Sequence, residues 1–309
     1  MGIVVLGAVF VDIKGFPHDV YVPTGRNAGH IQYIHGGVSR NVVEDIANIE
    51  LRPTYISIVD ESALGEEVIK KLERHKVNVE YIQKIPEGMG TWLAVFSDDG
   101  DLAGSISQRP NLMPILDLLN EKGDEIFKDC DSIVLEADID PEIIKKVLDF
   151  AHKYDKKVYG VISNMSLAVG RRDLLQQFDC LVCNELEAGI FFAENYSKKS
   201  AKELCEIISQ KVKAGAMKSM VVTMGSKGSI YADQNGDKGI CPAKKVTVRD
   251  TTGAGDAFCA GLSIGLTYGK DLKESVEIGT RLAASVITSS ENVCPRFLPQ
   301  ELGLDVTVK

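Results

Sequence analysis

The sequence contains no hydrophobic run long enough to cross a membrane. Its first apolar stretch, residues 3–11, ends at Asp12 and is far shorter than the roughly 20 residues that a bilayer requires. The same stretch has neither a basic start nor a small-residue cleavage site, so we do not expect a secretory signal. These absences predict no membrane partner and a cytoplasmic location.

The sequence also has fewer basic than acidic residues. The 309 residues include 35 Lys and Arg against 44 Asp and Glu, which gives a formal net charge of -9. A protein that binds nucleic acid through its phosphates needs a basic surface, so we expect no nucleic acid partner. Small substrates remain possible because they respond to local charge rather than to the net charge.

Disulfide and metal-binding patterns are missing as well. The seven cysteines lie scattered from Cys130 to Cys294, and their odd number fits reduced thiols better than a disulfide framework. Cys180 and Cys183 have CxxC spacing, but a second pair is absent and the run 178–183 is typical of a buried strand. None of the five His residues lies in a metal-ligand pattern with a second His or Cys, so we expect no catalytic zinc.

Two common nucleotide-binding fingerprints do not occur. Gly225-Ser226-Lys227-Gly228 has the wrong spacing and ending for a GxxxxGK loop that continues in Ser or Thr. No GxGxxG follows the first apolar run, which argues against a nicotinamide-dependent dehydrogenase. Phosphate binding would therefore have to arise elsewhere in the chain.

What the sequence does contain is a regular alternation of short apolar runs with helical stretches. This alternation indicates right-handed βαβ crossovers. We predict an α/β fold with a mainly parallel sheet that is covered by helices on both faces. The expected strands are 3–6, 54–59, 132–136, 157–162, 180–183 and 219–223, and the expected helices include 38–49, 65–75, one that begins at Asp140-Pro141, 255–268 and 272–289.

Two segments, about 13–35 and 90–110, interrupt this alternation. The first is rich in Pro, Gly and polar residues, and the second has strand-like runs at 91–97 and 102–107 around a tight acidic turn, which is a hairpin signal. We predict that they form a small β-lid inserted within a single domain, 1–309. A lid that excludes water suits a transferase, because hydrolysis of the donor competes with transfer.

The most informative segment is residues 248–258, with the sequence VRDTTGAGDAF. We expect it to end a strand and to begin a helix. Glycines at such a junction let backbone N–H groups point at a ligand, and the helix N-terminus adds partial positive charge. Both suit a phosphoryl group in transfer, and Asp256 in the first turn is placed to accept a proton from an attacking hydroxyl. The alternative is an ordinary capped helix start.

With this string the chain resembles the PfkB, or ribokinase-like, family of carbohydrate and nucleoside kinases over essentially its whole length. The resemblance implies a ribokinase-like fold and transfer of the γ-phosphoryl group of ATP, with Mg²⁺, to a sugar hydroxyl. It implies that Gly253, Ala254 and Gly255 form an anion hole and that Asp256 is the catalytic base. Many relatives bind a monovalent cation through positions that match Asp250 and Thr252, so K⁺ is a candidate second ion.

A second landmark, Gly36-Gly37-Val38-Ser39-Arg40-Asn41, lies near the N-terminus. The resemblance places Gly36, Gly37 and Asn41 at the sugar, and an ordinary helix start is the alternative. Asp12, which we expect to end the first strand at the ligand-binding edge of the sheet, matches the substrate-binding aspartate of the family. Glu136 ends the strand 132–136 at the same edge, where we expect either a weaker substrate contact or a solvated strand end.

Two further motifs concern the nucleotide. Asn184-Glu185-Leu186-Glu187 follows a strand and matches the Asn-x-x-Glu motif of the family, so Asn184 and Glu187 are expected to place the phosphates and the Mg²⁺, Glu187 through water. The segment 221–228 resembles the strand and glycine turn that border the nucleotide, which implicates Thr223, Gly225 and Gly228. An ordinary helix start and an ordinary hairpin turn are the alternatives.

Three local features point to a branch within the family. Asn27–Ile31 leads into the double glycine, Arg40 directly precedes Asn41, and residues 288–295 lack the glycine that many ribokinases carry there. These features resemble the pseudouridine kinase branch; a sugar kinase for ribose, fructose or a related acceptor, and a catalytically idle nucleoside-binding relative, are the alternatives. The missing glycine also puts the K⁺ site in question. By resemblance we expect a primary ribose-type hydroxyl as acceptor and a homodimer that forms through the lids.

Overall fold

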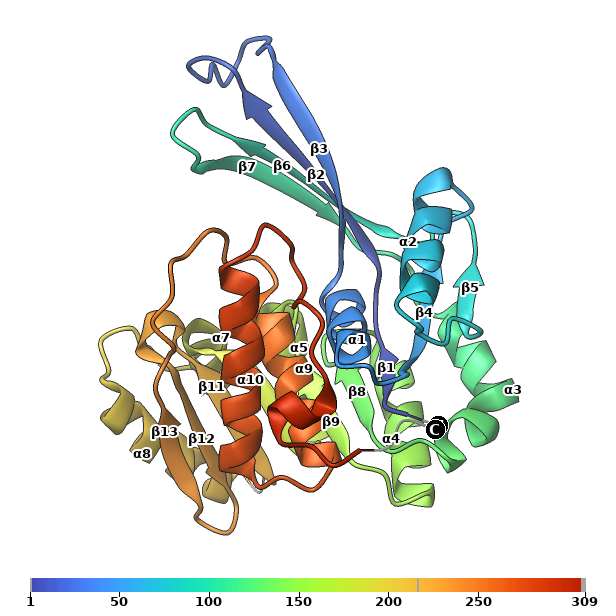
Figure 1. Ribbon diagram of the computed structural model, residues 1–309, viewed down its shortest axis with the longest axis vertical. Helices are drawn as coiled ribbons and strands as arrows, with labels where there is room; N and C mark the ends of the chain where they lie inside the picture. The colour runs from blue at the N-terminus through green and yellow to red at the C-terminus, as the bar shows by residue number, and fades with distance from the viewer. Residues whose placement is uncertain (1, 216, 307–309) are drawn as a thin grey trace.

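The structure is a computed structural model that describes residues 2–215 and 217–306. Figure 1 shows a body built from one large sheet and its helices, with a second, smaller sheet that projects from one end. The predicted α/β class, mainly parallel sheet and β-lid are confirmed. Within the described residues, no helix is long and apolar enough to cross a membrane.

The elements fall close to their expected positions, because apolar runs and helix caps act locally in the sequence. Asp140, for example, accepts a hydrogen bond from the backbone N–H of Glu142 and so caps the helix expected to begin there. The strands are β1 (Val4–Leu6), β2 (Phe10–Pro17), β3 (Gly29–Gly36), β4 (Thr54–Val59), β5 (Ile82–Lys84), β6 (Gly90–Phe96), β7 (Leu102–Gln108), β8 (Ile133–Glu136), β9 (Val158–Val161), β10 (Cys180–Asn184), β11 (Ser219–Thr223), β12 (Ser229–Asp233) and β13 (Lys238–Cys241). The α-helices are α1 (Val38–Asn48), α2 (Ala63–Arg74), α3 (Pro114–Lys128), α4 (Pro141–Lys153), α5 (Met165–Ala168), α6 (Arg172–Leu175), α7 (Glu185–Phe192), α8 (Ala201–Ala214), α9 (Ala254–Thr267) and α10 (Leu272–Ile287).

The main sheet has nine strands in the order β13-β12-β11-β10-β9-β8-β1-β4-β5. The strands from β11 to β5 pair in parallel, whereas β12 and β13 are antiparallel additions at one edge. Parallel strands end at the same side of a sheet, so β8, β10 and β11 all deliver the residues that follow them to one edge. Ligands of open α/β sheets bind at that edge.

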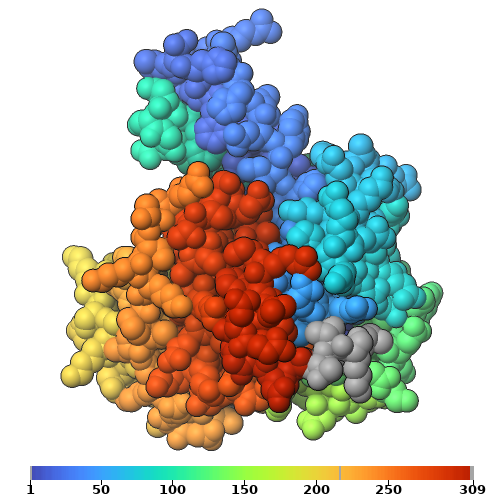
Figure 2. All heavy atoms as spheres, in the orientation of Figure 1, coloured from blue at the N-terminus to red at the C-terminus, as the bar shows by residue number. Residues whose placement is uncertain are grey.

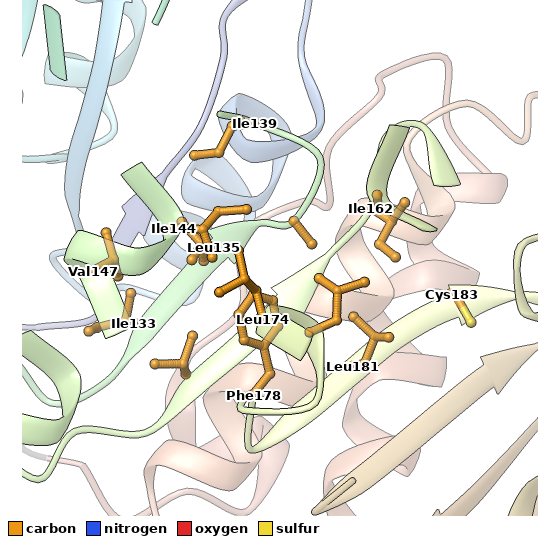
Figure 3. Close-up of a cluster of buried hydrophobic side chains, with 14 of the residues drawn as sticks. Ile133, Leu135, Ile139, Ile144, Val147, Ile162, Leu174, Phe178, Leu181 and Cys183 are labelled. Carbon is orange, nitrogen blue, oxygen red and sulfur yellow. The ribbon is translucent and has the colours of Figure 1, made fainter. Parts of the chain in front are cut away.

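Two hydrophobic cores fill the space on the two faces of this sheet. One packs β-strand side chains against α3, α4 and α8, and Figure 3 shows part of it, with Ile133 and Leu135 of β8 near Ile144 of α4 and Phe178. The other packs the opposite side chains of the same strands against α1, α2, α9 and α10. Because both faces of the sheet are buried, the sequences of its central strands are nearly continuous apolar runs.

The small sheet, which we call the lid, has the order β3-β2-β6-β7. Asp12 pairs with Ile34 and with Trp92 across the sheet, so these three side chains share one face, the inner face. Ile13 pairs with Tyr33 and Leu93 on the opposite, outer face. Figure 2 shows that the lid stands away from the body of the molecule.

Two sequence-based expectations about strands are wrong. Asp12 does not end the first strand, which stops at Leu6; it is the third residue of the lid strand β2. The segment before the glycine-rich string is not a strand either, because residues 242–250 form a loop in which Val248 is 60% exposed. Its alternating apolar residues resemble those of a strand, but among the described residues no strand pairs with it.

Candidate active site

The glycine-rich string forms the N-terminus of α9, as expected. Gly253 is the residue before the helix and has a left-handed backbone, with φ of 81°. A Cβ atom at this position would lie 1.9 Å from the carbonyl oxygen of Asn292, so glycine is required both by the backbone angle and by the approach of a second chain segment. Gly255 is different, since a Cβ atom there would meet no atom within 4 Å. The space beside Gly255 is therefore open to a ligand.

Asp256 lies in the first turn of α9 and is held by Asn41 of α1. The Asn41 Nδ2 atom donates to Oδ2 of Asp256 at 2.6 Å. Burial is the main cause that raises the pKa of Asp256 to about 7, and the charges of Glu187 and Asp12 raise it further, against the effects of the Asn41 hydrogen bond and of Arg40. A carboxylate with a pKa near neutrality is well matched to general-base work.

A cavity of about 1330 Å³ opens beside Asp256. Its walls come from the ends of β10 and β11, from α7, from the turn Gly225–Gly228, from the start of α9 and from α10. Among the residues expected at the nucleotide, all five line this cavity: Asn184, Glu187, Thr223, Gly225 and Gly228. Ala254, Gly255 and Asp256 line it too, so the structure brings the expected nucleotide residues and the expected base together.

Asn184 and Glu187 cap the N-terminus of α7 for each other. Oδ1 of Asn184 accepts from the backbone N–H of Glu187 at 2.9 Å, and Oε2 of Glu187 accepts from the backbone N–H of Asn184 at 2.7 Å. This capping box uses only one of the two carboxylate oxygens of Glu187. The motif thus has a structural function, and it also presents a carboxylate to the cavity.

The residues expected at the sugar gather on the other side of Asp256. A Cβ atom on Gly36 would lie 2.7 Å from Oδ1 of Asp12, so the carboxylate of Asp12 lies directly against Gly36. Gly37 has φ of 101°, and a Cβ atom there would meet the Ala8 carbonyl oxygen at 2.5 Å. Burial raises the pKa of Asp12, although the nearby Lys14 and Arg40 oppose this. Asp12, Gly36, Gly37 and Asn41 therefore form one cluster around the start of α1.

Glu136 ends β8 as expected, but it is not a solvated strand end. Only 1% of the residue is exposed, and Oε2 accepts from the backbone N–H of Ala8 and from Ser39, both at 2.9 Å. Burial and the neighbouring Asp138 raise the pKa of Glu136 to about 7. The carboxylate joins the end of β1 to the start of α1.

Arg109 and Asp138 form a contact beside Glu136 that the sequence did not reveal. Arg109 follows the lid strand β7, and its guanidinium lies 2.8 Å from Asp138 and 3.7 Å from Glu136. Asp138 also accepts from the backbone N–H and from the hydroxyl of Ser163. An isolated Arg after a hairpin carries no local signal, and its carboxylate partners are distant in the sequence.

Arg40 has a structural role that the sequence did not reveal. It is 1% exposed, pairs with Glu44 at 2.5 Å, and donates to the backbone carbonyl groups of His35 and Gly36. The guanidinium thus binds the backbone of residues 35–36 and the carboxylate of Glu44. Arg40 therefore cannot serve as a marker of the acceptor.

The donor set fits Mg²⁺ held mainly by phosphate and water. Glu187 and Asp256 border the same cavity, and within 2–215 and 217–306 no three His, Cys, Asp or Glu side chains form a complete metal cage. Mg²⁺ usually binds one or two carboxylates together with substrate phosphates. The positions expected for K⁺ are more exposed: Asp250 Oδ1 accepts from the backbone N–H of Thr252 at 2.8 Å, and this hydrogen bond is the main cause that lowers its pKa.

Comparison with known proteins decides the family. The pattern of the pfkB family carbohydrate kinases matches residues 2–294. A guanosine-inosine kinase of Exiguobacterium acetylicum is 31% identical over 292 residues, which cover 94% of this chain and 95% of that protein. The chain belongs to the pfkB family of carbohydrate kinases.

Other relatives in the pfkB family bear on fold and branch. A pseudouridine kinase of Escherichia coli is 25% identical over 275 residues, which cover 89% of this chain and 86% of that protein. The solved structure of Arabidopsis thaliana ribokinase complexed with ribose and ATP superimposes with a TM-score of 0.83 at 20% identity and covers 99% of both chains. The ribokinase-like fold is thereby confirmed, and the enzyme is a PfkB-family, ATP-dependent sugar or nucleoside kinase. The pseudouridine branch is not singled out, because the guanosine-inosine kinase is the more similar of these two relatives.

Proposed function

We propose that this pfkB-family kinase transfers the γ-phosphoryl group of ATP to the primary 5'-hydroxyl of a ribonucleoside, with Asp256 as the base. The observation that carries the proposal is the position of Asp256. Its carboxylate lies where the cavity lined by Asn184, Thr223 and Gly255 meets the cluster of Asp12 and Asn41. A phosphoryl donor on one side and an acceptor hydroxyl on the other would both reach this carboxylate.

The reaction follows from that arrangement. ATP in the cavity would place its γ-phosphate at the N-terminus of α9, where the backbone N–H groups and the helix dipole favour negative charge. Asp12 would hold the sugar hydroxyls, and Asp256 would take the proton of the attacking hydroxyl. Mg²⁺, when bound near Glu187, would neutralise charge on the phosphates.

The inner face of the lid supports a nucleoside rather than a free sugar. Trp92 is the direct cross-strand neighbour of Asp12 on this face, and Ile34 flanks Asp12 on the other side. An acceptor whose ribose is held by Asp12 would place a base within reach of the Trp92 ring, and stacking on an aromatic ring stabilises a base by about 1–3 kcal/mol. A free sugar lacks the aromatic base that would stack on this ring.

Among nucleosides, a purine ribonucleoside is our first candidate. The similarity to a guanosine-inosine kinase over 94% of the chain supports it. Pseudouridine is the second candidate, on the similarity to a pseudouridine kinase and on the features around residues 27–31 and 288–295. Of the features that suggested pseudouridine, Arg40 no longer counts because it is buried in an ion pair.

The test is ADP release with guanosine, inosine, pseudouridine, uridine, adenosine, ribose and fructose as acceptors. We expect the largest kcat/KM with guanosine or inosine, and little turnover with the free sugars. The single Trp also allows a binding assay, since a nucleoside that stacks on Trp92 would change its fluorescence in the absence of ATP. Fast turnover of ribose with no fluorescence response to any nucleoside would overturn the choice of acceptor.

The role of Asp256 is tested separately with Asp256→Asn. This variant should keep the fold and lose at least about 100-fold in rate, which is the scale of one general base. The exposed Asp149 on α4, changed in the same way, is the matched control. Normal turnover of Asp256→Asn would remove Asp256 as the base, and nucleoside binding without ADP release in the unaltered protein would instead favour the idle relative.

Potassium is a separate part of the proposal. The Asn292 carbonyl oxygen closely approaches the turn that contains Asp250, Thr252 and Gly253, and oxygen atoms of this kind suit a monovalent cation. Assays at constant ionic strength with K⁺ replaced by a large organic cation test it. A rate that does not respond to K⁺ would show that this cation is not required.

We also propose a homodimer that forms through the outer face of the lid. This face exposes Ile31, Tyr33, Leu93 and Ile106 by 41–70% each, which is unusual for neighbouring large apolar side chains. Light scattering should give the mass of a dimer, and Ile106→Lys should give a monomer. Leu167→Lys, at an exposed apolar side chain outside the lid, should leave the dimer intact.

A further inference from the structure

Asn292 lies in the loop after α10 and contacts both ends of the active-site cluster. Its Nδ2 atom donates to Oδ1 of Asn41 at 3.2 Å and to the backbone carbonyl of His35 at 3.1 Å. Its own carbonyl oxygen closely approaches Gly253, at the start of the anion hole. One residue thus contacts the end of the lid strand β3, the partner of the base, and the turn that begins α9.

The side-chain contact fixes the orientation of the Asn41 amide. Asn41 can turn either its oxygen or its nitrogen toward Asp256, and only the nitrogen stabilises a carboxylate. Asn292 offers Asn41 a donor, so the Asn41 oxygen points to Asn292 and the nitrogen points to Asp256. Asn41 is 5% exposed, so water has little access to compete for these contacts.

The loop that carries Asn292 is itself anchored to α1. Asp45 accepts from the backbone N–H of Cys294 at 2.6 Å, and Asn48 donates to the Cys294 carbonyl at 2.7 Å. These anchors position the loop without touching Asn41 or Asp256. They therefore provide a means to separate the anchoring of the loop from the contact made by Asn292.

We infer that Asn292 is a positioning residue of the phosphoryl transfer, which fixes Asn41 in the orientation that donates to Asp256 and links this orientation to the end of lid strand β3. The inference rests on the proposed function, in which Asp256 is the base. Asn292 does not have to touch the acceptor or ATP to act in this way. Its contribution is to hold Asn41 in the hydrogen bond that favours the ionised form of Asp256.

Several charges face Asp256 and set the background for this effect. Glu187 from α7 and Asp12 from β2 raise its pKa, while Arg40 from α1 lowers it. Asp45 of α1 is close enough for its own pKa to respond to Asp256, although burial is the main cause of that shift. The Asn41 hydrogen bond is the largest of the effects that lower the pKa of Asp256. Losing it should therefore move the titration of the base to higher pH.

The experiment is the pH dependence of kcat/KM for Asn292→Asp, with Asn48→Ala as the control for the anchoring of the loop. The carboxylate introduced by Asn292→Asp cannot donate to Asn41 and would attract the Asn41 nitrogen away from Asp256. Since the hydrogen bond from Asn41 stabilises the charged form of Asp256, its loss should move the acid limb of the pH profile, where kcat/KM falls as the pH falls, up by about one pH unit or more in Asn292→Asp. Most of the lost rate should return by about pH 9, whereas a purely structural defect would lower the rate at every pH. Asn48→Ala should lower the midpoint of urea unfolding and leave the acid limb of the pH profile unchanged.

The charge of the new carboxylate is controlled in the Asn41→Ala background. There the contact is already absent, so any remaining shift caused by Asn292→Asp measures the charge alone. The inference is overturned if Asn292→Asp shifts the acid limb equally in the unaltered protein and in the Asn41→Ala background. It is also overturned if Asn41→Ala alone leaves the acid limb unmoved. This second result does not depend on how well the Asn292 variants fold. An inactive Asp256→Asn with an unmoved limb in Asn292→Asp would refute only the role of Asn292, whereas an active Asp256→Asn would refute the proposed base.

Discussion

Arg109, which follows lid strand β7, forms an ion pair with Asp138, with 2.8 Å between Nη1 and Oδ2. The Asp138 side chain is fully buried and that of Glu136 is 1% exposed, whereas that of Arg109 is 31% exposed. The same guanidinium therefore balances two buried carboxylates at the edge of the sheet. It also connects the end of lid strand β7 to the end of β8 in the main sheet.

Arg109→Ala should destabilise the protein by about 3 kcal/mol, because it leaves two buried acids without their cation. Urea denaturation measures this effect, and Asp138→Asn in the same background should recover part of the loss. Lys153→Ala is the matched control, since it breaks an exposed pair with Asp124 and should cost much less stability than Arg109→Ala. Equal costs for Arg109→Ala and Lys153→Ala would contradict the role of the buried pair.

The rate should depend on pH through a group that titrates near 7. Asp256 has a raised pKa of about 7 and accepts a proton only when it is ionised, so kcat/KM should fall as the pH falls through 7. Glu136 has a raised pKa of about 7 as well, mainly through burial. Glu136→Gln distinguishes the two groups: the acid limb should persist in this variant, and its disappearance would assign the limb to Glu136.

Much of the fold could be predicted from the sequence because its signals are local. The strand predicted at 54–59 has the same ends as β4, and the helix expected to begin at Asp140-Pro141 does begin there. The failures concern segments whose neighbours decide their structure. Residues 242–250 alternate like a strand but find no pairing partner, and Asp12 belongs to a lid strand whose start is set by its pairing with β3 and β6.

The residues of the candidate site likewise fall into those with local sequence signals and those without. The proposed base, the glycines proposed as the anion hole and the Asn-x-x-Glu motif stand in contiguous strings, so their types and spacing could be interpreted directly. Arg109, Asp138 and Asn292 act through partners that are remote in the chain; Asn292 and Asn41, for example, are 251 positions apart. Only the folded chain brings such pairs together, and Arg109 and Asp138 have no distinctive local context.

Gly253→Ala should damage both stability and activity. The change forces a side chain into a left-handed backbone and toward the Asn292 carbonyl oxygen, 1.9 Å from the new Cβ atom. Gly269 is the matched control, because its φ is 86° but a Cβ atom there meets nothing within 4 Å. Gly269→Ala should lose about 1 kcal/mol of stability from the backbone angle alone and keep full activity. Equal urea midpoints for Gly253→Ala and Gly269→Ala would contradict the close approach of the Asn292 carbonyl oxygen to Gly253.

Gly255→Ala separates the space for the phosphoryl group from the stability of the helix. Gly255 lies in the first turn of α9 with an ordinary right-handed backbone, and an added methyl group meets no protein atom. Alanine favours a helix over glycine by up to about 1 kcal/mol, so the variant should be as stable as the unaltered protein or slightly more so. Its rate should nevertheless fall by about 10-fold or more, because the methyl group occupies the space that the γ-phosphoryl group needs. A stable Gly255→Ala variant with unchanged kcat and unchanged KM for ATP would show that the phosphoryl group does not pass beside this residue.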